Sequence, residues 1–420
     1  MKLQLQPQLI QPAMKEACLV IDRLLQAGFS AFFVGGAVRD TMLGRDIHDV
    51  DIATSALPQQ VMALFEKSIP TGLQHGTVTV IVEGQSYEIT TFRIETGYVD
   101  YRRPGDVQFV SELNRDLMRR DFTMNAMAID RDWMLHDPFD GWSHLQSGIL
   151  VTVGTSSERF QEDALRMLRA IRFAASYQLT IERQCWEAII HYGHLLNHVA
   201  MERVAYELER MLNSDFPARG ITLLLESGLL SHTKEKLNLA SGHFHQNWLT
   251  DKKDDASMKW AALFICLGMS SECALEDMRK LRLSNKLIQT SSGILQLYEC
   301  VHIYIGSEQS HEGLKERWLD ILLQFPLDQT RLFLRLLEQH DERVAMLAAY
   351  DEALSIHSMK QLAVRGNDLL KWYSKPSGPW VKQALAFLFK RVASGTLTND
   401  KKAIHSFVTN QIEGGLSNEQ

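Results

Sequence analysis

Two patterns of apolar residues divide the chain near residue 150. Before that point, short apolar runs alternate with glycine turns, and from Ser156 apolar residues recur at helical spacing almost to the end. Phe32 to Val34 is apolar without a helical period, so we expect a buried strand. Gly35-Gly36 then lets the backbone bend, with its N–H groups open to an anion, into a helix from about Ala37 to Leu43.

Two carboxylates mark the next predicted strand. Val50 and Ile52 alternate with Asp49 and Asp51, and on a strand this alternation puts both carboxylates on one face. Two like charges so close raise each other's pKa unless a cation lies with them, and hard oxygen ligands suit Mg²⁺. Together with a glycine turn that can hold phosphates, the pair indicates metal-assisted nucleotidyl transfer. Taken alone, an Asp-x-Asp is also common in ordinary loops.

A hairpin and a polar segment follow. Residues 77–82 and 87–92 predict two strands joined over residues 83–86, and Glu88 could supply a third carboxylate to the metal site. Residues 93–110 are polar and aromatic and contain glycine, so we expect a mobile loop.

The predicted helix from Arg159 to Phe173 carries two stripes, each repeating every three residues. One stripe is apolar, and the other consists of Asp163, Arg166, Arg169 and Arg172. Side chains three apart are neighbours on a helix, so the second stripe is a contiguous polar strip with one acid at its N-terminal end. Such a strip is either an ordinary salt-bridged surface or a face that reads a polar ligand.

Length and composition set the broad class. A chain of 420 residues is too long for one core, so we expect two to four domains. No apolar run approaches the roughly 20 residues that a bilayer span needs, and Met1 to Pro12 lacks a signal-peptide core. The five cysteines are scattered and form no Cys-x-x-Cys. We therefore expect a cytoplasmic protein without membrane association, disulfides or a zinc ribbon.

Charge is distributed unevenly along the chain. The net charge is −7, but residues 360–402 hold nine Lys and Arg against Asp368 and Asp400, a local charge of +7. A basic end on an acidic protein is what a surface that follows phosphates would have. The alternative is a solvated helix face.

Three motifs together resemble a known superfamily. They are Gly35 to Asp40 followed by Asp49-Val50-Asp51, then Arg119 to Ala126, and then Glu162 to Phe173. With them the chain resembles the polymerase-β-like nucleotidyltransferases, and among these the class II tRNA nucleotidyltransferases, or CCA-adding enzymes, and the bacterial poly(A) polymerases. The specific motifs cover about the first 210 residues, and a weaker likeness to the Gram-positive type runs to the C-terminus.

The resemblance implies an α+β protein. A nucleotidyltransferase head with a mixed sheet and helices would occupy residues 1–145. All-α neck, body and tail domains would occupy residues 146–212, 213–310 and 311–420, with base recognition in the neck and tRNA binding in the tail.

The resemblance also implies the activity and the site. CMP, CMP and AMP would pass stepwise from CTP and ATP to the 3′ end of tRNA, and a full-length loop at 93–110 favours the complete activity. Asp49 and Asp51 would hold two Mg²⁺ ions as the catalytic metal ligands. The nucleotide-binding residues would be Gly36, Arg39, Arg120, Asp163, Arg166, Arg169 and Arg172.

Base choice follows from chemistry as well as from the resemblance. Cytosine and adenine both present an amino donor beside a ring-nitrogen acceptor, so Asp163 can accept from the amino group while Arg166 donates to the ring. Uracil and guanine present the opposite pattern. Three alternatives stay open: a poly(A) polymerase, an enzyme that adds only C or only A, and an RNA-binding protein without catalysis. A homodimer is a further possibility.

Overall fold

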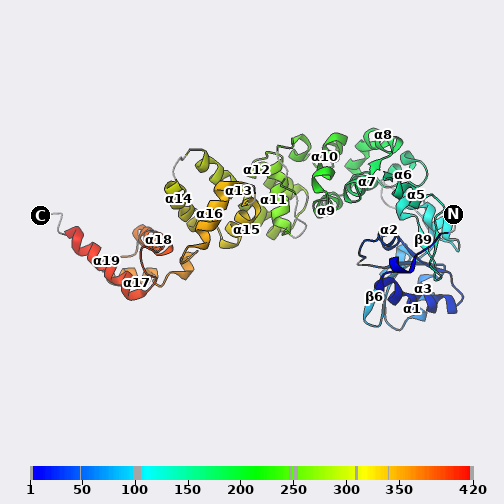
Figure 1. The fold of residues 1–420 in the computed structure, drawn as a ribbon, viewed down its shortest axis with the longest axis horizontal. Helices are drawn as coiled ribbons and strands as arrows, with labels where there is room; N and C mark the ends of the chain where they lie inside the picture. Colours follow the sequence, from blue (N-terminus) through cyan, green and yellow to red (C-terminus); the bar gives the residue numbers. More distant parts are fainter. Residues whose placement is uncertain are drawn as a thin grey trace. The chain divides into compact units, whose positions relative to one another are not determined.

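The structure is a computed structural model, and it describes residues 3–47, 49–97, 106–245, 248–249, 254–307, 311–338 and 340–416. The chain folds into two compact units. The first holds residues 1–241 with 280–282, and the second holds residues 242–279 with 283–420. Strands lead the first unit and helices make up the second (Figure 1), so the predicted α+β class is confirmed. The four-domain division remains a prediction.

The first unit is built on a mixed sheet in the strand order β1-β10-β9-β2-β3-β6-β5-β4. Its strands are β1 Leu3–Gln4, β2 Ala31–Val34, β3 Asp51–Thr54, β4 Ser68–Gly72, β5 Thr77–Val82, β6 Gln85–Thr91, β9 Ala128–Ile129 and β10 Met134–His136. Only β3 and β6 pair in parallel within this sheet as described, with Asp51 opposite Glu88. The predicted hairpin is confirmed as β5 and β6, with a tighter turn than expected.

Helices in the first part of this unit connect the strands. They are α1 Pro12–Gln26, α2 Gly36–Met42, α3 Pro58–Leu64, α4 Leu113–Met118 and α5 Gly141–Gln146. Helix α1 packs on β2, and α3 packs on β5 and β6. Helix α2 follows directly from the end of β2 through Gly35, whose φ of 71° only glycine adopts without strain.

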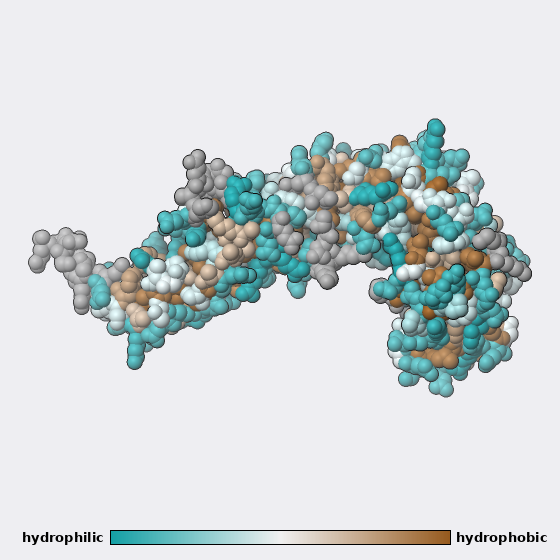
Figure 2. All heavy atoms as spheres, viewed as in Figure 1, coloured by the Kyte–Doolittle hydropathy of each residue, from teal (hydrophilic) through white to brown (hydrophobic). Residues whose placement is uncertain are grey.

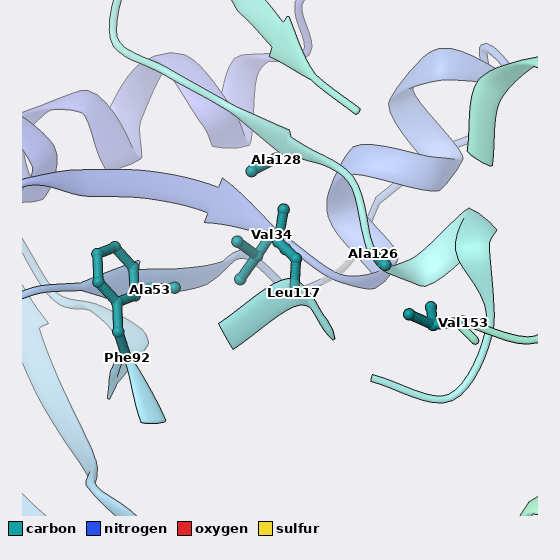
Figure 3. Close-up of a cluster of buried hydrophobic side chains, with 7 residues drawn as sticks. All are labelled: Val34, Ala53, Phe92, Leu117, Ala126, Ala128 and Val153. Atoms are coloured by element: carbon teal, nitrogen blue, oxygen red, sulfur yellow. The ribbon is translucent and has the colours of Figure 1, made fainter. Parts of the chain in front are cut away.

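A buried cluster joins α4 to the centre of the sheet (Figure 3). Val34 on β2, Ala53 on β3 and Leu117 on α4 are all at most 2% exposed. The other members are Phe92, Ala126, Ala128 and Val153. This packing places the end of α4, and the arginines after it, beside the end of β2 and the start of β3.

Two local predictions were wrong. Residues 93–110 were expected to be loop throughout, but Arg93–Thr96 and Asp106–Phe109 pair as strands β7 and β8; residues 98–105 lie outside the described part. The single helix from Arg159 to Phe173 is two helices, α6 Ser156–Glu162 and α7 Leu165–Ser176. Asp163 separates them with extended backbone (φ −142°, ψ 106°), and its side chain accepts a hydrogen bond from Leu165 N–H instead.

Further helices complete the first unit after α7. They are α8 Arg183–Tyr192, α9 Met201–Leu212 and α10 Pro217–Ser227. Helix α9 buries an apolar stripe that includes Val204, Leu208 and Met211, and it packs against α7. The remaining face of α9 carries charged residues at helical spacing.

The second unit is helical. Its main helices are α11 Ala256–Cys266, α12 Ser271–Lys280, α13 Asn285–Ser307, α14 His311–Gln324, α15 Leu327–Leu337, α16 Glu342–Glu352, α17 Gly366–Tyr373, α18 Pro379–Ala393 and α19 Lys401–Leu416. On the face drawn in Figure 2, hydrophilic residues cover most of the surface and hydrophobic residues lie scattered among them. Within the described ranges, no helix combines the length and the apolar character that crossing a membrane requires.

Candidate active site

A cavity of about 810 Å³ lies within the first unit and collects all nine predicted site residues. They are Gly36, Arg39, Asp49, Asp51, Arg120, Asp163, Arg166, Arg169 and Arg172. They come from α2, the start of β3, the segment after α4, the α6–α7 break and α7. The structure thus brings together residues that lie more than 100 positions apart in sequence.

The two aspartates lie where β3 begins. Asp49 and Asp51 are exposed and line the cavity, while Val50 and Ile52, which alternate with them, are buried (7% and 0% exposed), so the predicted alternation is confirmed. A Cβ on Gly35 would lie 3.2 Å from Asp51 Oδ2 and 3.5 Å from an Arg120 Nη atom. Glycine therefore allows the β2 turn to approach the carboxylate and the guanidinium at once.

The charge environment of Asp51 suits a cation. Partial desolvation in the cavity raises the pKa of Asp51, and the nearby carboxylates of Glu88 and Asp49 raise it further, against the opposing effect of Arg120. A divalent cation would relieve this repulsion, and the carboxylate oxygens are the donors that Mg²⁺ prefers. Among the described residues, no group of three or more His, Cys, Asp and Glu side chains is arranged to hold a metal.

Arg39 is held in place by its neighbours. Its guanidinium pairs with Asp40 at 2.8 Å, donates to Asn125 Oδ1 at 2.6 Å and lies 4.5 Å from the centroid of the Tyr177 ring. Asn125 in turn donates to Asp121 Oδ1 at 2.9 Å. Burial alone would raise the pKa of Asp121, but Arg169, Asn125 and Arg166 hold it well below its usual range. Asp121 is therefore a buried anion that organises the cavity wall.

Arg169 and Arg172 both pair with carboxylates. Arg169 binds Asp121 Oδ2 at 2.6 Å and lies 3.7 Å from Glu207, and Arg172 Nε donates to Glu207 Oε2 at 2.6 Å. The Arg172 and Glu207 side chains are 5% and 2% exposed. Their contacts link helices α7 and α9 beside the cavity. In this arrangement both arginines contribute positive potential and rigidity to the wall.

Asp163 meets an arginine that the sequence did not point to. Arg203 on α9 donates to Asp163 Oδ1 at 3.2 Å and to Oδ2 at 2.8 Å, in a bidentate pair. With the hydrogen bond from Leu165 N–H at 3.1 Å, the carboxylate accepts three described hydrogen bonds. A carboxylate has about four lone-pair sites, so roughly one remains for a ligand donor.

Arg166 is fixed by different partners. It pairs with Glu162 at 2.5 Å and donates to the backbone carbonyl oxygens of Arg159 and Arg119 at 3.3 and 3.0 Å. Arg203 holds Asp163, and Glu162 holds Arg166. Asp163 and Arg166 both line the cavity. Each is oriented separately, so the cavity wall holds one fixed acceptor and one fixed donor.

Sequence reasoning missed the contribution of α9. Arg203, Glu207 and Arg210 lie at positions i, i+4 and i+7 of that helix. Glu207 is buried, although the pattern alone would place a glutamate in solvent. The available signal was the spacing of these charges opposite an apolar stripe.

The chain matches three families along its length. Residues 31–151 match the Poly A polymerase head domain, and residues 252–408 match tRNA nucleotidyltransferase domain 2. Residues 178–239 match a probable RNA and SrmB-binding site of polymerase A. The first match includes the carboxylate strand, the glycine turn and Arg120.

Whole-chain relatives agree. A CCA-adding enzyme of Geobacillus sp. (strain WCH70) is 40% identical over 398 residues, covering 94% of this chain and 96% of that protein. One of Bacillus cereus is 38% identical over 415 residues, covering 94% and 98%.

Solved structures share the fold. The Bacillus stearothermophilus CCA-adding enzyme in complex with CTP superposes with a TM-score of 0.80 at 35% identity, covering 97% of this chain and 100% of that one. The Thermotoga maritima CCA-adding enzyme complexed with tRNA has a TM-score of 0.69 at 18% identity, covering 98% and 99%. The chain belongs to the family of CCA-adding enzymes.

Proposed function

We propose that this chain adds C, C and A to the 3′ end of tRNA from CTP and ATP, one nucleotide at a time and without a nucleic-acid template. The observation that carries the proposal is one cavity that holds both the paired carboxylates Asp49 and Asp51 and the base-reading candidates Asp163 and Arg166. The relatives at 38–40% identity are CCA-adding enzymes, which supports it. So do related structures solved with CTP and with tRNA.

The reaction forms one P–O bond and breaks another. The 3′-hydroxyl oxygen of tRNA attacks the α-phosphorus of the nucleotide, its proton is released to solvent, and pyrophosphate leaves. Asp49 and Asp51 would hold two Mg²⁺ ions, which when bound neutralise charge on the attacking and leaving oxygens. Arg120, beside Asp51, binds the triphosphate, and the glycine turn at Gly36 lets phosphate approach the backbone. Arg39 orients the sugar and phosphates from the other side of that turn.

Selection of C and A is proposed to lie with two separately held side chains. The remaining acceptor site of Asp163 faces the amino group of cytosine or adenine, and Arg203 keeps the carboxylate in one orientation. Arg166 donates to the ring nitrogen and is itself oriented by Glu162. Because both bases share this edge pattern, one pocket can take C and then A. Arg169 and Arg172 add positive potential to the cavity wall, which favours the nucleotide phosphates.

The C-terminal part of the chain is proposed to bind the tRNA. We propose that residues 360–402 contact the phosphates of the tRNA body; within this segment Lys390 and Lys401 already pair with Asp320 and Asp368. The proposed domains are the head at 1–145, the neck at 146–212, the body at 213–310 and the tail at 311–420. We place the protein in the cytoplasm, where its five free cysteines remain reduced. A homodimer is to be tested by light scattering.

Single-nucleotide reactions test the function. With CTP alone, tRNA ending at the discriminator base should gain two C residues and stop. With ATP alone, tRNA ending in CC should gain one A, and tRNA without CC should stay unextended. Long adenosine tails with ATP would instead identify a poly(A) polymerase, which the match of residues 31–151 keeps as the rival.

A further inference from the structure

Arg210 differs from the other arginines of the cavity. Eight arginines line it, and seven form an ion pair with a carboxylate. For Arg210, the described residues offer no carboxylate partner. Its guanidinium instead donates to Tyr206 Oη at 3.1 Å and lies 5.5 Å from the centroid of the Tyr206 ring. Arg210 is exposed, so its charge is available to an anionic ligand.

Tyr206 is the second unusual side chain at this place. It is 53% exposed, and the only other aromatic residue among the exposed large hydrophobic residues of the described part is Phe387. Tyr206 and Arg210 lie one turn apart on α9, so an aromatic ring lies beside a planar guanidinium, and the guanidinium belongs to a residue that lines the cavity. A flat ring next to an uncompensated guanidinium is suited to a nucleotide, with its base stacked and its phosphate paired.

We infer that the Tyr206–Arg210 pair binds the 3′-terminal nucleotide of the tRNA. This inference rests on the proposed function. The incoming base is assigned to Asp163, which Arg203 contacts on the same helix. Seven residues of α-helix separate Arg203 from Arg210, a rise of about 10 Å. Arg210 therefore lies beyond the reach of that base edge, about where the neighbouring nucleotide would present its phosphate, and Tyr206 lies between Arg203 and Arg210 on the helix, where the base of that nucleotide could stack.

The same phosphate chemistry could come from the incoming triphosphate, so the test separates the two. Arg210→Gln and Tyr206→Ala are assayed for addition of the first C, with tRNA and CTP varied in turn. Arg210→Gln should raise the KM for tRNA roughly 10-fold or more, as expected for loss of a hydrogen bond to a charged group. Tyr206→Ala should raise it about five-fold or more through lost stacking. The KM for CTP should stay within about two-fold in both variants, a range of roughly 0.4 kcal/mol.

Matched variants exclude a general effect. Tyr206→Phe keeps the ring and should stay close to the unmodified protein in its KM for tRNA. Arg183→Gln removes an arginine that is 91% exposed on α8 and paired with Glu187, away from the cavity, and should change neither constant. Both test side chains are exposed, so thermal unfolding should remain unchanged. Arg210→Gln should also reduce the salt dependence of tRNA binding by about 0.7 in the log–log slope.

A rise in the KM for CTP with the KM for tRNA unchanged would overturn the inference and assign the pair to the triphosphate. Unchanged constants in both variants would overturn it as well. If the unmodified protein adds no C to tRNA, the proposed function itself fails, which is a different outcome.

Discussion

Replacing Asp163 with asparagine tests how the base is chosen. The carboxylate accepts hydrogen bonds from Arg203 at 2.8 and 3.2 Å and from Leu165 N–H at 3.1 Å. An amide of the same shape has only one oxygen, so one arm of the bidentate contact is lost and an NH₂ donor replaces an acceptor. The amino group of cytosine then meets a donor where it needs an acceptor. The carbonyl of uracil, in contrast, gains a hydrogen-bond donor.

The magnitude follows from the base contact. A good bidentate pair is worth about 1–3 kcal/mol of discrimination, so the preference for CTP over UTP should fall roughly five- to 150-fold. The assay is kcat/KM for all four nucleotides on tRNA that ends at the discriminator base. Activity should persist at a reduced level, because Asp49 and Asp51 lie on a different element.

Arg203→Gln is the companion variant. It frees the Asp163 carboxylate from its bidentate partner without removing it. The preference for CTP over UTP should therefore also fall, but by less than in Asp163→Asn. In the double variant the two effects should not add, because both act through one contact. If Asp163→Asn lowers kcat/KM equally for every nucleotide, the aspartate is structural and this account of base choice is wrong.

Three other perturbations address separate parts of the molecule. Asp51→Asn should abolish incorporation of both C and A and leave tRNA affinity nearly unchanged in a filter-binding assay; near-normal turnover would contradict the metal assignment. In Asp121→Asn, the free energy of unfolding should fall less between neutral and acid pH than it does in the unmodified protein. The pKa of Asp121 is lower in the folded state than its ordinary value of 3.8, so the Asp121–Arg169 contact stabilises the fold above pH 4 and is lost as the pH falls further. Chemical denaturation at pH 7, 4 and 3 measures this, and an identical pH dependence in the variant would refute it. Truncation before Lys360 should weaken tRNA binding and lower its salt slope by about one unit for each lost phosphate contact; an unchanged slope would mean a merely solvated face.

Local patterns predicted much of the head. The apolar run at Phe32–Val34, the glycines after it and the alternation from Asp49 to Ile52 depend on neighbouring residues alone, and the structure has β2, α2 and β3 there. The sequence also made it possible to expect Glu88 near Asp51, because both lie on predicted strands; the structure places the two residues opposite each other on parallel strands.

Other features depend on contacts between distant residues. The helical period continues through Asp163, so the break between α6 and α7 has no signal in the apolar pattern. Asp163 pairs with Arg203 forty positions later, and Arg169 pairs with Asp121 forty-eight positions earlier. A sequence shows that these charges exist, but the packing of α7 against α9 decides which of them meet. For this reason the polar strip was predicted as one surface, whereas it is divided among several ion pairs.

The most direct test of the central claim is the sequence of the reaction product. The protein is incubated with tRNA that lacks its 3′ CCA and with all four nucleotides at equal concentration, and the 3′ ends are then sequenced. A CCA-adding activity should leave nearly all extended molecules ending in CCA and growing no further, with UMP and GMP rarely incorporated. Tails of adenosine, mixed 3′ sequences or the absence of any extension would contradict it.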